Sequence, residues 1–217
     1  MPVSFRYFLP RFVLISLVTI SLFSLPQAAQ AKIKIVAFGD SLTAGYQLPP
    51  DAAFPVQLQK ALEEKYPDVA IANAGVSGDT SKGGLHRLDW ALDDDVDAVI
   101  LELGANDALR GIDPSFTEKA LDDILTKLKS RNIEVLIAGM IAPPNFGQDY
   151  AAAFNPIFAR LAEKHGALLY PFFLDGVAAK PELNLPDGMH PTRDGVAIIV
   201  QNILPSVEAL IERARKQ

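Results

Sequence analysis

Two kinds of hydrophobic pattern alternate along the chain after residue 31. Short, continuous apolar runs of β-prone residues are separated by longer stretches in which apolar residues recur with a helical period. The short runs predict five strands, at residues 33–38, 69–73, 98–103, 134–139 and 167–171. The longer stretches predict helices near residues 54–65, 81–92, 114–131, 149–165 and 194–214. This alternation indicates βα units and therefore an α/β protein with a parallel sheet.

The first 31 residues follow a different pattern. Arg6 and Arg11 precede an uncharged apolar stretch at residues 12–25, and the small-residue triplet Ala29-Gln30-Ala31 follows it. This layout predicts a signal peptide at residues 1–31, cleaved after Ala31, and a single domain at residues 32–217. An uncleaved membrane anchor is the alternative, but residues 12–25 fall short of the roughly 20 apolar residues that span a bilayer. We therefore expect an exported protein, periplasmic or secreted, with no stable membrane span after cleavage.

Charge and cysteine content exclude several function classes. The formal net charge of −6 becomes −8 when Arg6 and Arg11 leave with the signal peptide, because residues 1–31 contain no acid. A protein this acidic is a poor candidate for binding nucleic acid. The absence of cysteine excludes disulfides, thiolate metal sites and a cysteine nucleophile. Nothing in the sequence indicates an oligomeric state.

Polar residues follow the first three predicted strands at the points where these strands end. The segments are Gly39-Asp40-Ser41-Leu42, Ser77-Gly78-Asp79 and Gly104-Ala105-Asn106-Asp107. In open parallel sheets, ligands bind beyond the carboxyl ends of the strands. The common strand order 2-1-3-4-5 would place Ser41 between Gly78 and Asn106. A carbonyl attacked by Ser41 would then meet three donors, which are the backbone N–H groups of Ser41 and Gly78 and the side-chain amide of Asn106.

A serine nucleophile needs a base, and the sequence offers three histidines. His86 and His165 lie within or at the end of predicted helices. His190 lies in a loop rich in Pro and Gly, residues 172–193, three residues after Asp187. A glycine between the two lets the chain turn, so that Asp187 reaches Nδ1 of the ring and Nε2 faces Ser41. The sequence therefore predicts a triad of Ser41, Asp187 and His190.

These segments, together with Asp187-Gly188-Met189-His190-Pro191, resemble the conserved blocks of the SGNH hydrolases, also called GDSL esterases. The similarity is greatest to a periplasmic branch described as acyl-CoA thioesterase, arylesterase and lysophospholipase. In that branch the three strand-end blocks continue much as Thr43-Ala44-Gly45-Tyr46, Ser77-Gly78-Asp79-Thr80-Ser81 and Asp107-Ala108-Leu109-Arg110-Gly111 do here. The third block departs from many relatives in carrying Ala105 instead of glycine, which leaves Asn106 in place.

The resemblance implies a fold and a set of roles. The fold is a flavodoxin-like three-layer α/β/α sandwich around a five-stranded parallel sheet. Ser41 is the nucleophile and first oxyanion donor, Gly78 and Asn106 complete the oxyanion hole, and Asp187 and His190 complete the triad. The loop at residues 141–147 is similar to one that lines the acyl cleft in relatives, and we expect the acyl chain to contact Leu109, Ile141 and Phe146. No metal or organic cofactor is implied.

The leading hypothesis is a serine esterase and thioesterase that hydrolyses small-molecule or lipid acyl esters through an acyl-serine intermediate. Its substrates would include aryl esters, lysophospholipids and acyl thioesters. One alternative is an O-acetylesterase of polysaccharide or cell wall, whose activity would fall steeply beyond acetyl. Another is a non-catalytic ligand-binding module, in which Asp187 and His190 would have no role.

Several other polar and aromatic residues are expected to be structural. Asp40 and Asp79 are expected to organise loops through hydrogen bonds to nearby amides. Trp90 is expected to lie in the core. The acidic run at residues 93–95 has no histidine beside it, so we interpret it as a solvated helix end and not as a metal site.

Overall fold

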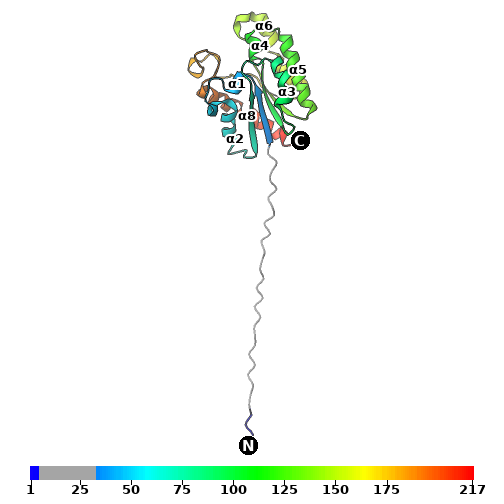
Figure 1. Ribbon diagram of the computed structural model, residues 1–217, viewed down its shortest axis with the longest axis vertical. Helices are drawn as coiled ribbons and strands as arrows, with labels where there is room; N and C mark the ends of the chain where they lie inside the picture. Colours follow the sequence, from blue (N-terminus) through cyan, green and yellow to red (C-terminus); the bar gives the residue numbers. More distant parts are fainter. Residues whose placement is uncertain (5–32) are drawn as a thin grey trace. The chain divides into compact units, whose positions relative to one another are not determined.

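The computed structural model describes residues 1–4 and 33–217, so the predicted signal peptide lies outside the described residues except for residues 1–4. Strands and helices alternate through residues 33–217 (Figure 1). The strands are β1 (Ile33–Gly39), β2 (Val69–Gly75), β3 (Ala98–Glu102), β4 (Glu134–Ala138) and β5 (Leu168–Tyr170). The α-helices are α1 (Ser41–Ala44), α2 (Phe54–Leu62), α3 (Ser81–Ala91), α4 (Ala105–Leu109), α5 (Pro114–Ser130), α6 (Gly147–Phe154), α7 (Ile157–His165) and α8 (Arg193–Ala214). Three short 3₁₀ turns are η1 (Pro50–Ala52), η2 (Pro144–Phe146) and η3 (Pro181–Leu183).

The five strands form one parallel sheet in the order β2-β1-β3-β4-β5, which confirms the predicted strands and their order. β1 has a neighbour on each side up to its carboxyl end, because its last residue, Gly39, pairs with Gly75 of β2 and with Glu102 of β3. β3 is buried along its whole length. Strands buried on both faces require the continuous apolar runs seen in the sequence.

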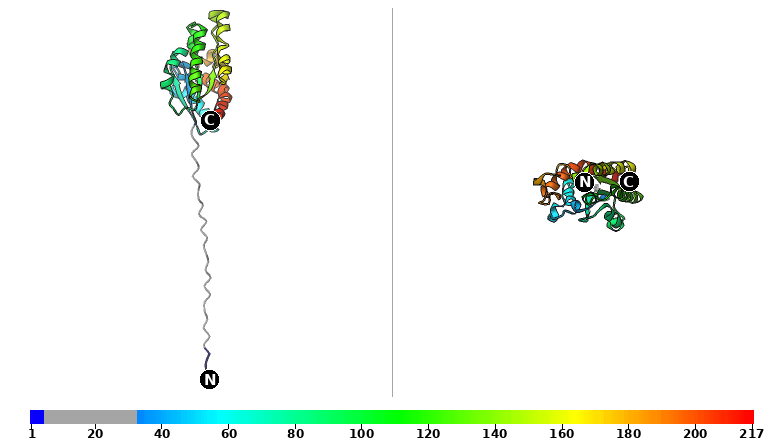
Figure 2. Two further views of the ribbon diagram at one scale, coloured as in Figure 1. Left: turned by 90° about the vertical axis from the view of Figure 1, so that its right-hand side faces the viewer. Right: turned by 90° about the horizontal axis from the view of Figure 1, so that it is seen from above.

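Helices cover both faces of the sheet, as Figure 2 shows from the side and from above. α2 and α8 pack together on one face, while α3, α5 and α7 form a row on the other. This division follows from right-handed crossovers, because the chain moves in one direction from β1 to β2 and in the opposite direction from β2 onward. Among the described residues only α8 is long and apolar enough to cross a membrane, and its apolar side chains pack against α2 and the sheet. The expected α/β/α sandwich is confirmed.

The predicted helix at residues 149–165 is wrong in one respect, because it is two helices. α6 ends at Phe154 and α7 begins at Ile157, with Asn155 and Pro156 between them. Proline lacks a backbone N–H, so Pro156 cannot donate the helical hydrogen bond, and the helix is interrupted there although Asn155 and Pro156 both keep helical backbone angles. The side chain of Asn155 accepts a hydrogen bond from the backbone N–H of Ala142 (2.8 Å), which ties this break to the loop after β4.

The prediction that Trp90 lies in the core is also wrong, because its side chain is 74% exposed. The buried positions of α3 are Ser81, Gly84, Arg87 and Leu88, which lie on the opposite face of the helix. An arginine therefore takes a core position that the sequence pattern would assign to an apolar residue. The acidic run is structural, as expected: Asp93 and Asp95 both accept hydrogen bonds from Nζ of Lys34 (2.7 Å each).

Candidate active site

The carboxyl ends of β1, β2 and β3 bring three of the expected segments side by side. β1 ends at Gly39, and α1 begins two residues later at Ser41. Asp40 caps this helix, because its Oδ1 accepts a hydrogen bond from the backbone N–H of Leu42 (3.0 Å). The pairing of Gly39 with both neighbouring strands places the Ser41 turn between the loop of Gly78 and the start of α4, where Asn106 lies.

Hydrogen bonds connect Ser41, His190 and Asp187 in one chain. Nε2 of His190 lies 2.9 Å from Oγ of Ser41, and its Nδ1 lies 2.8 Å from Oδ2 of Asp187. The other carboxylate oxygen of Asp187 accepts hydrogen bonds from the backbone N–H groups of Met189 (2.9 Å) and His190 (3.0 Å). Gly188 supplies the positive φ of +69° at this turn, as expected from the sequence. With Nδ1–H donating to Asp187, Nε2 is free to accept the proton of Ser41.

The loop that carries His190 is fixed at both of its ends. Leu185 N–H donates to His190 O (2.7 Å) and Thr192 N–H donates to Leu183 O (2.9 Å). The buried side chain of Asn184 donates to the backbone carbonyls of Val177 and Lys180 (2.8 Å each). The loop is therefore an ordered platform, although it contains almost no regular secondary structure.

Gly78 and Asn106, the expected oxyanion donors, lie on either side of Ser41. Gly78 has φ +86°, and its carbonyl accepts a hydrogen bond from Nη2 of Arg110 (2.8 Å). Nδ2 of Asn106 donates to Oδ2 of Asp40 (2.9 Å). A side-chain amide carries two N–H donors, so this bond fixes the amide and leaves the second donor for the site.

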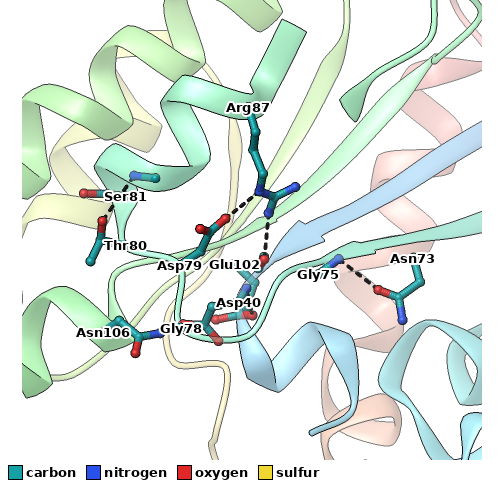
Figure 3. Close-up of polar contacts among 12 residues, drawn as sticks. Asp40, Asn73, Gly75, Gly78, Asp79, Thr80, Ser81, Arg87, Glu102 and Asn106 are labelled. Carbon is teal, nitrogen blue, oxygen red and sulfur yellow. Dashed lines mark hydrogen bonds and ion pairs between the residues drawn. The ribbon is translucent and has the colours of Figure 1, made fainter. Parts of the chain in front are cut away.

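A partly buried ion pair between Arg87 and Asp79 supports the loop of Gly78. Figure 3 shows the side chain of Arg87 extending from α3 toward Asp79. Its Nε donates to Asp79, its Nη2 donates to Gly39 O (2.8 Å), and its guanidinium lies 3.9 Å from the ring centroid of Phe38. Asp79 was expected to bond to nearby amides; its carboxylate instead accepts from the Arg87 guanidinium. One guanidinium ties the end of β1 to the loop after β2.

A pocket of about 560 Å³ opens beside Ser41. This volume is in the range of small-molecule sites. Leu109 and Ile141, two of the expected acyl contacts, line it and are about half exposed. The structure does not bring the third, Phe146, to the lining, because its ring packs beside Tyr150 and over Gly111. The lining residues are Ser41, Leu42, Tyr46, Ser77, Gly78, Ala105, Asn106, Ala108, Leu109, Met140, Ile141, Ala142, Pro143, Pro144, Phe172, Leu174, Ala178, Ala179, Asn184, Gly188, Met189 and His190.

Sequence reasoning missed two contributors to the site. The ring of Tyr46 packs on the imidazole of His190, with 4.4 Å between ring centroids, and nothing in the sequence links these residues. Glu102, fully buried at the end of β3, bonds to the residues around the Ser41 turn. A carboxylate inside an apolar strand was the signal that could have identified it. Across residues 33–217 together with residues 1–4, no cluster of His, Asp and Glu suits a metal ion.

The chain is similar to known hydrolases over most of its length. Residues 37–198 match the sequence model of the GDSL-like lipase/acylhydrolase family. An arylesterase from Vibrio mimicus is 42% identical over 170 residues, which cover 78% of this chain and 85% of that protein. The thioesterase 1/protease 1/lysophospholipase L1 of Escherichia coli strain K12 is 38% identical over 184 residues, covering 84% and 87%. The crystal structure of the esterase EstA from Pseudoalteromonas sp., inhibited by monoethylphosphonate, matches with a TM-score of 0.78 at 30% identity, covering 82% of this chain and 98% of that one.

Proposed function

This chain belongs to the GDSL-like lipase/acylhydrolase family and is a hydrolase of acyl esters, and we propose that Ser41, His190 and Asp187 carry out the hydrolysis. The observation that supports this assignment is the hydrogen-bonded chain from Ser41 through His190 to Asp187 at the edge of an apolar pocket. Each residue in it has the chemistry that its position requires: a hydroxyl to attack, an imidazole to take the proton and a carboxylate to orient the ring.

The reaction proceeds in two halves. Oγ of Ser41 attacks the carbonyl carbon of the ester while its proton passes to Nε2 of His190. The tetrahedral intermediate then collapses, and His190 returns the proton to the departing alcohol or thiol, which leaves an acyl-Ser41 ester. In the second half a water molecule attacks this ester and gives its proton to His190. The second tetrahedral intermediate then collapses, His190 returns this proton to Oγ of Ser41, and the carboxylic acid leaves.

Negative charge develops on the carbonyl oxygen in both halves. We assign its stabilisation to the backbone N–H groups of Ser41 and Gly78 and to Nδ2–H of Asn106. Loss of one such donor typically costs about 3–4 kcal/mol of barrier. Asn106 is a donor of fixed direction, because its other amide hydrogen is held by Asp40.

The pocket favours acyl groups longer than acetyl. Its volume of about 560 Å³ greatly exceeds the space an acetyl group fills, and Leu109, Met140 and Ile141 give it apolar walls. The names of the two relatives, arylesterase and thioesterase 1/protease 1/lysophospholipase L1, agree with an acyl site that tolerates different leaving groups. We therefore favour broad esterase and thioesterase activity on medium or long acyl chains over polysaccharide deacetylation.

We also infer that the chain is exported and cleaved after Ala31. The support is the sequence alone, with Arg6 and Arg11 before the apolar stretch and small residues before the cleavage point. An intact mass that corresponds to a chain beginning at Lys32, in protein recovered from the periplasm or medium, is the expected result.

Hydrolysis of a p-nitrophenyl ester series from acetyl to palmitoyl tests the function. Wild type is expected to cleave medium and long chains, and Ser41→Ala is expected to lose at least about 10³-fold in kcat because no nucleophile remains. Ser130→Ala, an exposed serine at the end of α5, is the matched control and should behave as wild type.

Covalent labelling adds a second readout. A reactive phosphonate ester is expected to add its mass to wild type and Ser130→Ala, at Ser41, and to leave Ser41→Ala unlabelled. Label found at another serine would contradict the assignment of the nucleophile. Activity confined to acetyl esters would move the assignment toward an O-acetylesterase, and an inert, unlabelled wild type would favour a ligand-binding module.

A further inference from the structure

Two carboxyl groups are fully buried beneath the turn that carries Ser41. They belong to Asp40 and Glu102, and neither residue has measurable solvent exposure. Glu102 ends β3, and its Oε2 accepts hydrogen bonds from Oγ1 of Thr43 (2.7 Å) and from the backbone N–H of Asp40 (3.2 Å). The second oxygen, Oε1, is buried and has no hydrogen-bond partner among the described residues. The proposed catalytic chemistry of Ser41, His190 and Asp187 gives Glu102 no task.

The space that the Glu102 carboxyl occupies depends on a glycine at position 39. A Cβ atom at Gly39 would lie 2.5 Å from Oε2 of Glu102 and 2.2 Å from Oγ1 of Thr43, so only glycine fits there. Gly39 and Glu102 are paired in the sheet, and the turn that begins at Asp40 therefore rests directly on the Glu102 carboxyl. A change in the position or charge of the Glu102 carboxyl must therefore displace the turn that carries Ser41.

The two carboxyls differ in the hydrogen bonds that they accept. Both oxygens of Asp40 are in use, Oδ1 by the backbone N–H of Leu42 and Oδ2 by Nδ2 of Asn106. Glu102 uses one oxygen only. Two adjacent buried carboxylates repel each other, so a site of this kind retains one negative charge and one proton. The hydrogen bonds favour the charge on Asp40 and the proton on Oε1 of Glu102.

On the proposed function, we propose that Glu102 is a positioning residue that acts as a neutral carboxylic acid: it holds the Ser41 turn through Thr43 and the Asp40 amide. It thereby leaves Asp40 as the charged member of the pair, and the Asp40 carboxylate orients the Asn106 side chain toward the oxyanion hole. Two hydrogen bonds connect Glu102 to Asn106. Oε2 of Glu102 accepts from the Asp40 backbone amide, and the Asp40 carboxylate accepts from the Asn106 side-chain amide.

The electrostatic environment agrees with this division. Burial raises the pKa of Glu102 well above its ordinary value, and the nearby Asp40 charge raises that pKa further. Burial also raises the pKa of Asp40, to about 6, although the hydrogen bonds from Leu42 and Asn106 oppose this rise. At neutral pH these directions leave Asp40 charged and Glu102 protonated.

Other charged groups face the pair from neighbouring elements. Arg87 of α3 binds Gly39 O, but its charge is balanced by Asp79. Asp107 of α4 raises the pKa of Asp40, and His190 lowers it when protonated. No ion pair in residues 33–217 includes Glu102. Within the described residues, therefore, no cation lies at ion-pair distance from Glu102 to offset a negative charge there.

Protein stability tests the protonation state without reference to activity. Glu102→Gln places an amide where the acid stands, so its carbonyl still accepts from Thr43 and Asp40 and it binds no proton. If Glu102 is neutral in the fold and ionised when unfolded, the unfolding equilibrium constant of wild type relative to Glu102→Gln rises by up to about tenfold per pH unit above the ordinary glutamate pKa. Denaturant unfolding at pH 5, 6, 7 and 8 measures this ratio. A ratio that stays constant or falls overturns the proposal.

Infrared spectroscopy provides a measurement that needs no variant. Glu102 is the only buried glutamate among the described residues, and residues 5–32 contain none. In wild type labelled with ¹³C at glutamate carboxyls, we expect a label-sensitive band of a protonated carboxylic acid at pH 7, where exposed glutamates are ionised. Absence of this band overturns the proposal even if Glu102→Gln fails to fold.

Kinetics test the positioning role. Glu102→Gln is expected to keep kcat for a medium-chain ester within about threefold of wild type at pH 7. Glu102→Leu has a similar size but leaves Thr43 and the Asp40 amide without an acceptor, and it is expected to lower kcat by about ten- to a hundredfold with KM nearly unchanged, approaching the loss of an oxyanion donor. Equal losses in the two variants overturn the role. An active Ser41→Ala would overturn the proposed function but leave the unfolding and infrared results to decide the state of Glu102.

Discussion

Asp187 accepts three hydrogen bonds and thereby combines two tasks in one carboxylate. Oδ1 binds the backbone N–H groups of Met189 and His190 and closes the turn, while Oδ2 binds the His190 ring. The N–H group of His190 is the largest cause of the lowered pKa of Asp187, about 2, and burial opposes it. The bonds that shape the turn also keep the carboxylate charged beside the His190 ring.

Replacement of Asp187 by Asn is expected to preserve the turn and impair the chemistry. The side-chain oxygen of Asn can still accept from Met189 and His190, but its NH₂ group then faces Nδ1 of the ring. His190 is held with its proton on Nε2, where it cannot accept the proton of Ser41. Steady-state kinetics should show a fall in kcat of about 10³–10⁴-fold. A loss below tenfold would contradict the assigned role.

The same pair of proteins tests the charge of Asp187. Its pKa is lowered by folding, so its contribution to stability is complete above the ordinary aspartate value of 3.8 and is lost as pH falls toward about 2. Thermal unfolding of wild type and Asp187→Asn should therefore converge between pH 4 and pH 2. If the difference in melting temperature between the two proteins stayed constant from pH 4 to pH 2, the charge of Asp187 would not be the source of the stability difference.

The sequence allowed the meeting of Ser41, Gly78 and Asn106 to be predicted, because strand ends are marked by polar residues after apolar runs and the strand order is a common one. The location of His190 followed from elimination among three histidines. The place of Glu102 could not be predicted in this way. It depends on the register that pairs Gly39 with Glu102, and register is set by the assembled sheet.

Among the elements, α8 supports the loop that carries His190. Thr192 caps this helix by accepting from Gly195 N–H (3.2 Å), and the backbone of Gly195 packs against the loop. A Cβ atom there would lie 2.2 Å from Leu183 O and 3.1 Å from Cβ of Pro191. A glycine in the first turn of a helix thus marks a close approach of backbone to backbone.

Gly195→Ala is expected to destabilise the protein although alanine is the better helix former. The new methyl group pushes the loop from the helix, and such overpacking costs about 1–3 kcal/mol. Because Leu183 and Pro191 flank the segment that holds His190, kcat should fall as well. Gln201→Ala, at an exposed position of α8, is the control for helix propensity. Denaturant unfolding would contradict the prediction if Gly195→Ala were as stable as that control.

Helices were predicted well where apolar spacing and end signals agreed, and less well where a break was overlooked. α5 begins with the Asp113 cap and Pro114, as its sequence indicates. The division into α6 and α7 lies at Pro156, a break signal that the predicted helix at residues 149–165 did not take into account. The prediction that Trp90 is buried was wrong for a different reason. The inward position on α3 is occupied by Arg87, whose hydrogen-bond partners lie in other segments of the chain.

In the whole molecule, the pocket walls come from segments that are far apart in sequence. Tyr46 follows α1, Leu109 ends α4, Ile141 follows β4 and Ala179 precedes η3. The hydrophobic pattern of the sequence identifies buried residues. A pocket forms where separate elements meet, so it produces no periodic pattern in the sequence. Phe146 is an example: it lies in the loop that was expected to line the acyl cleft, but its ring packs beside Tyr150.

Ile141→Trp is expected to shorten the acyl preference. Ile141 is half exposed in the pocket wall, so the larger ring fills the space for the chain without replacing a buried residue. For p-nitrophenyl decanoate relative to acetate, kcat/KM should fall by about tenfold or more. Phe146→Ala is the comparison, because its ring does not line the pocket, and it should leave this ratio unchanged. A similar ratio in Ile141→Trp and wild type would remove Ile141 from the acyl site.

Ser41 and His190 are separated by 149 positions in the chain, and β1 needs both β2 and β3 beside it before the Ser41 turn is framed. Synthesis begins at the amino terminus, so Ser41, the proposed nucleophile, emerges long before His190, its proposed base. A nascent chain therefore carries Ser41 without this histidine until residue 190 has been made. On the proposed function, a chain that ends before residue 190 holds the hydroxyl of Ser41 without the imidazole that would take its proton.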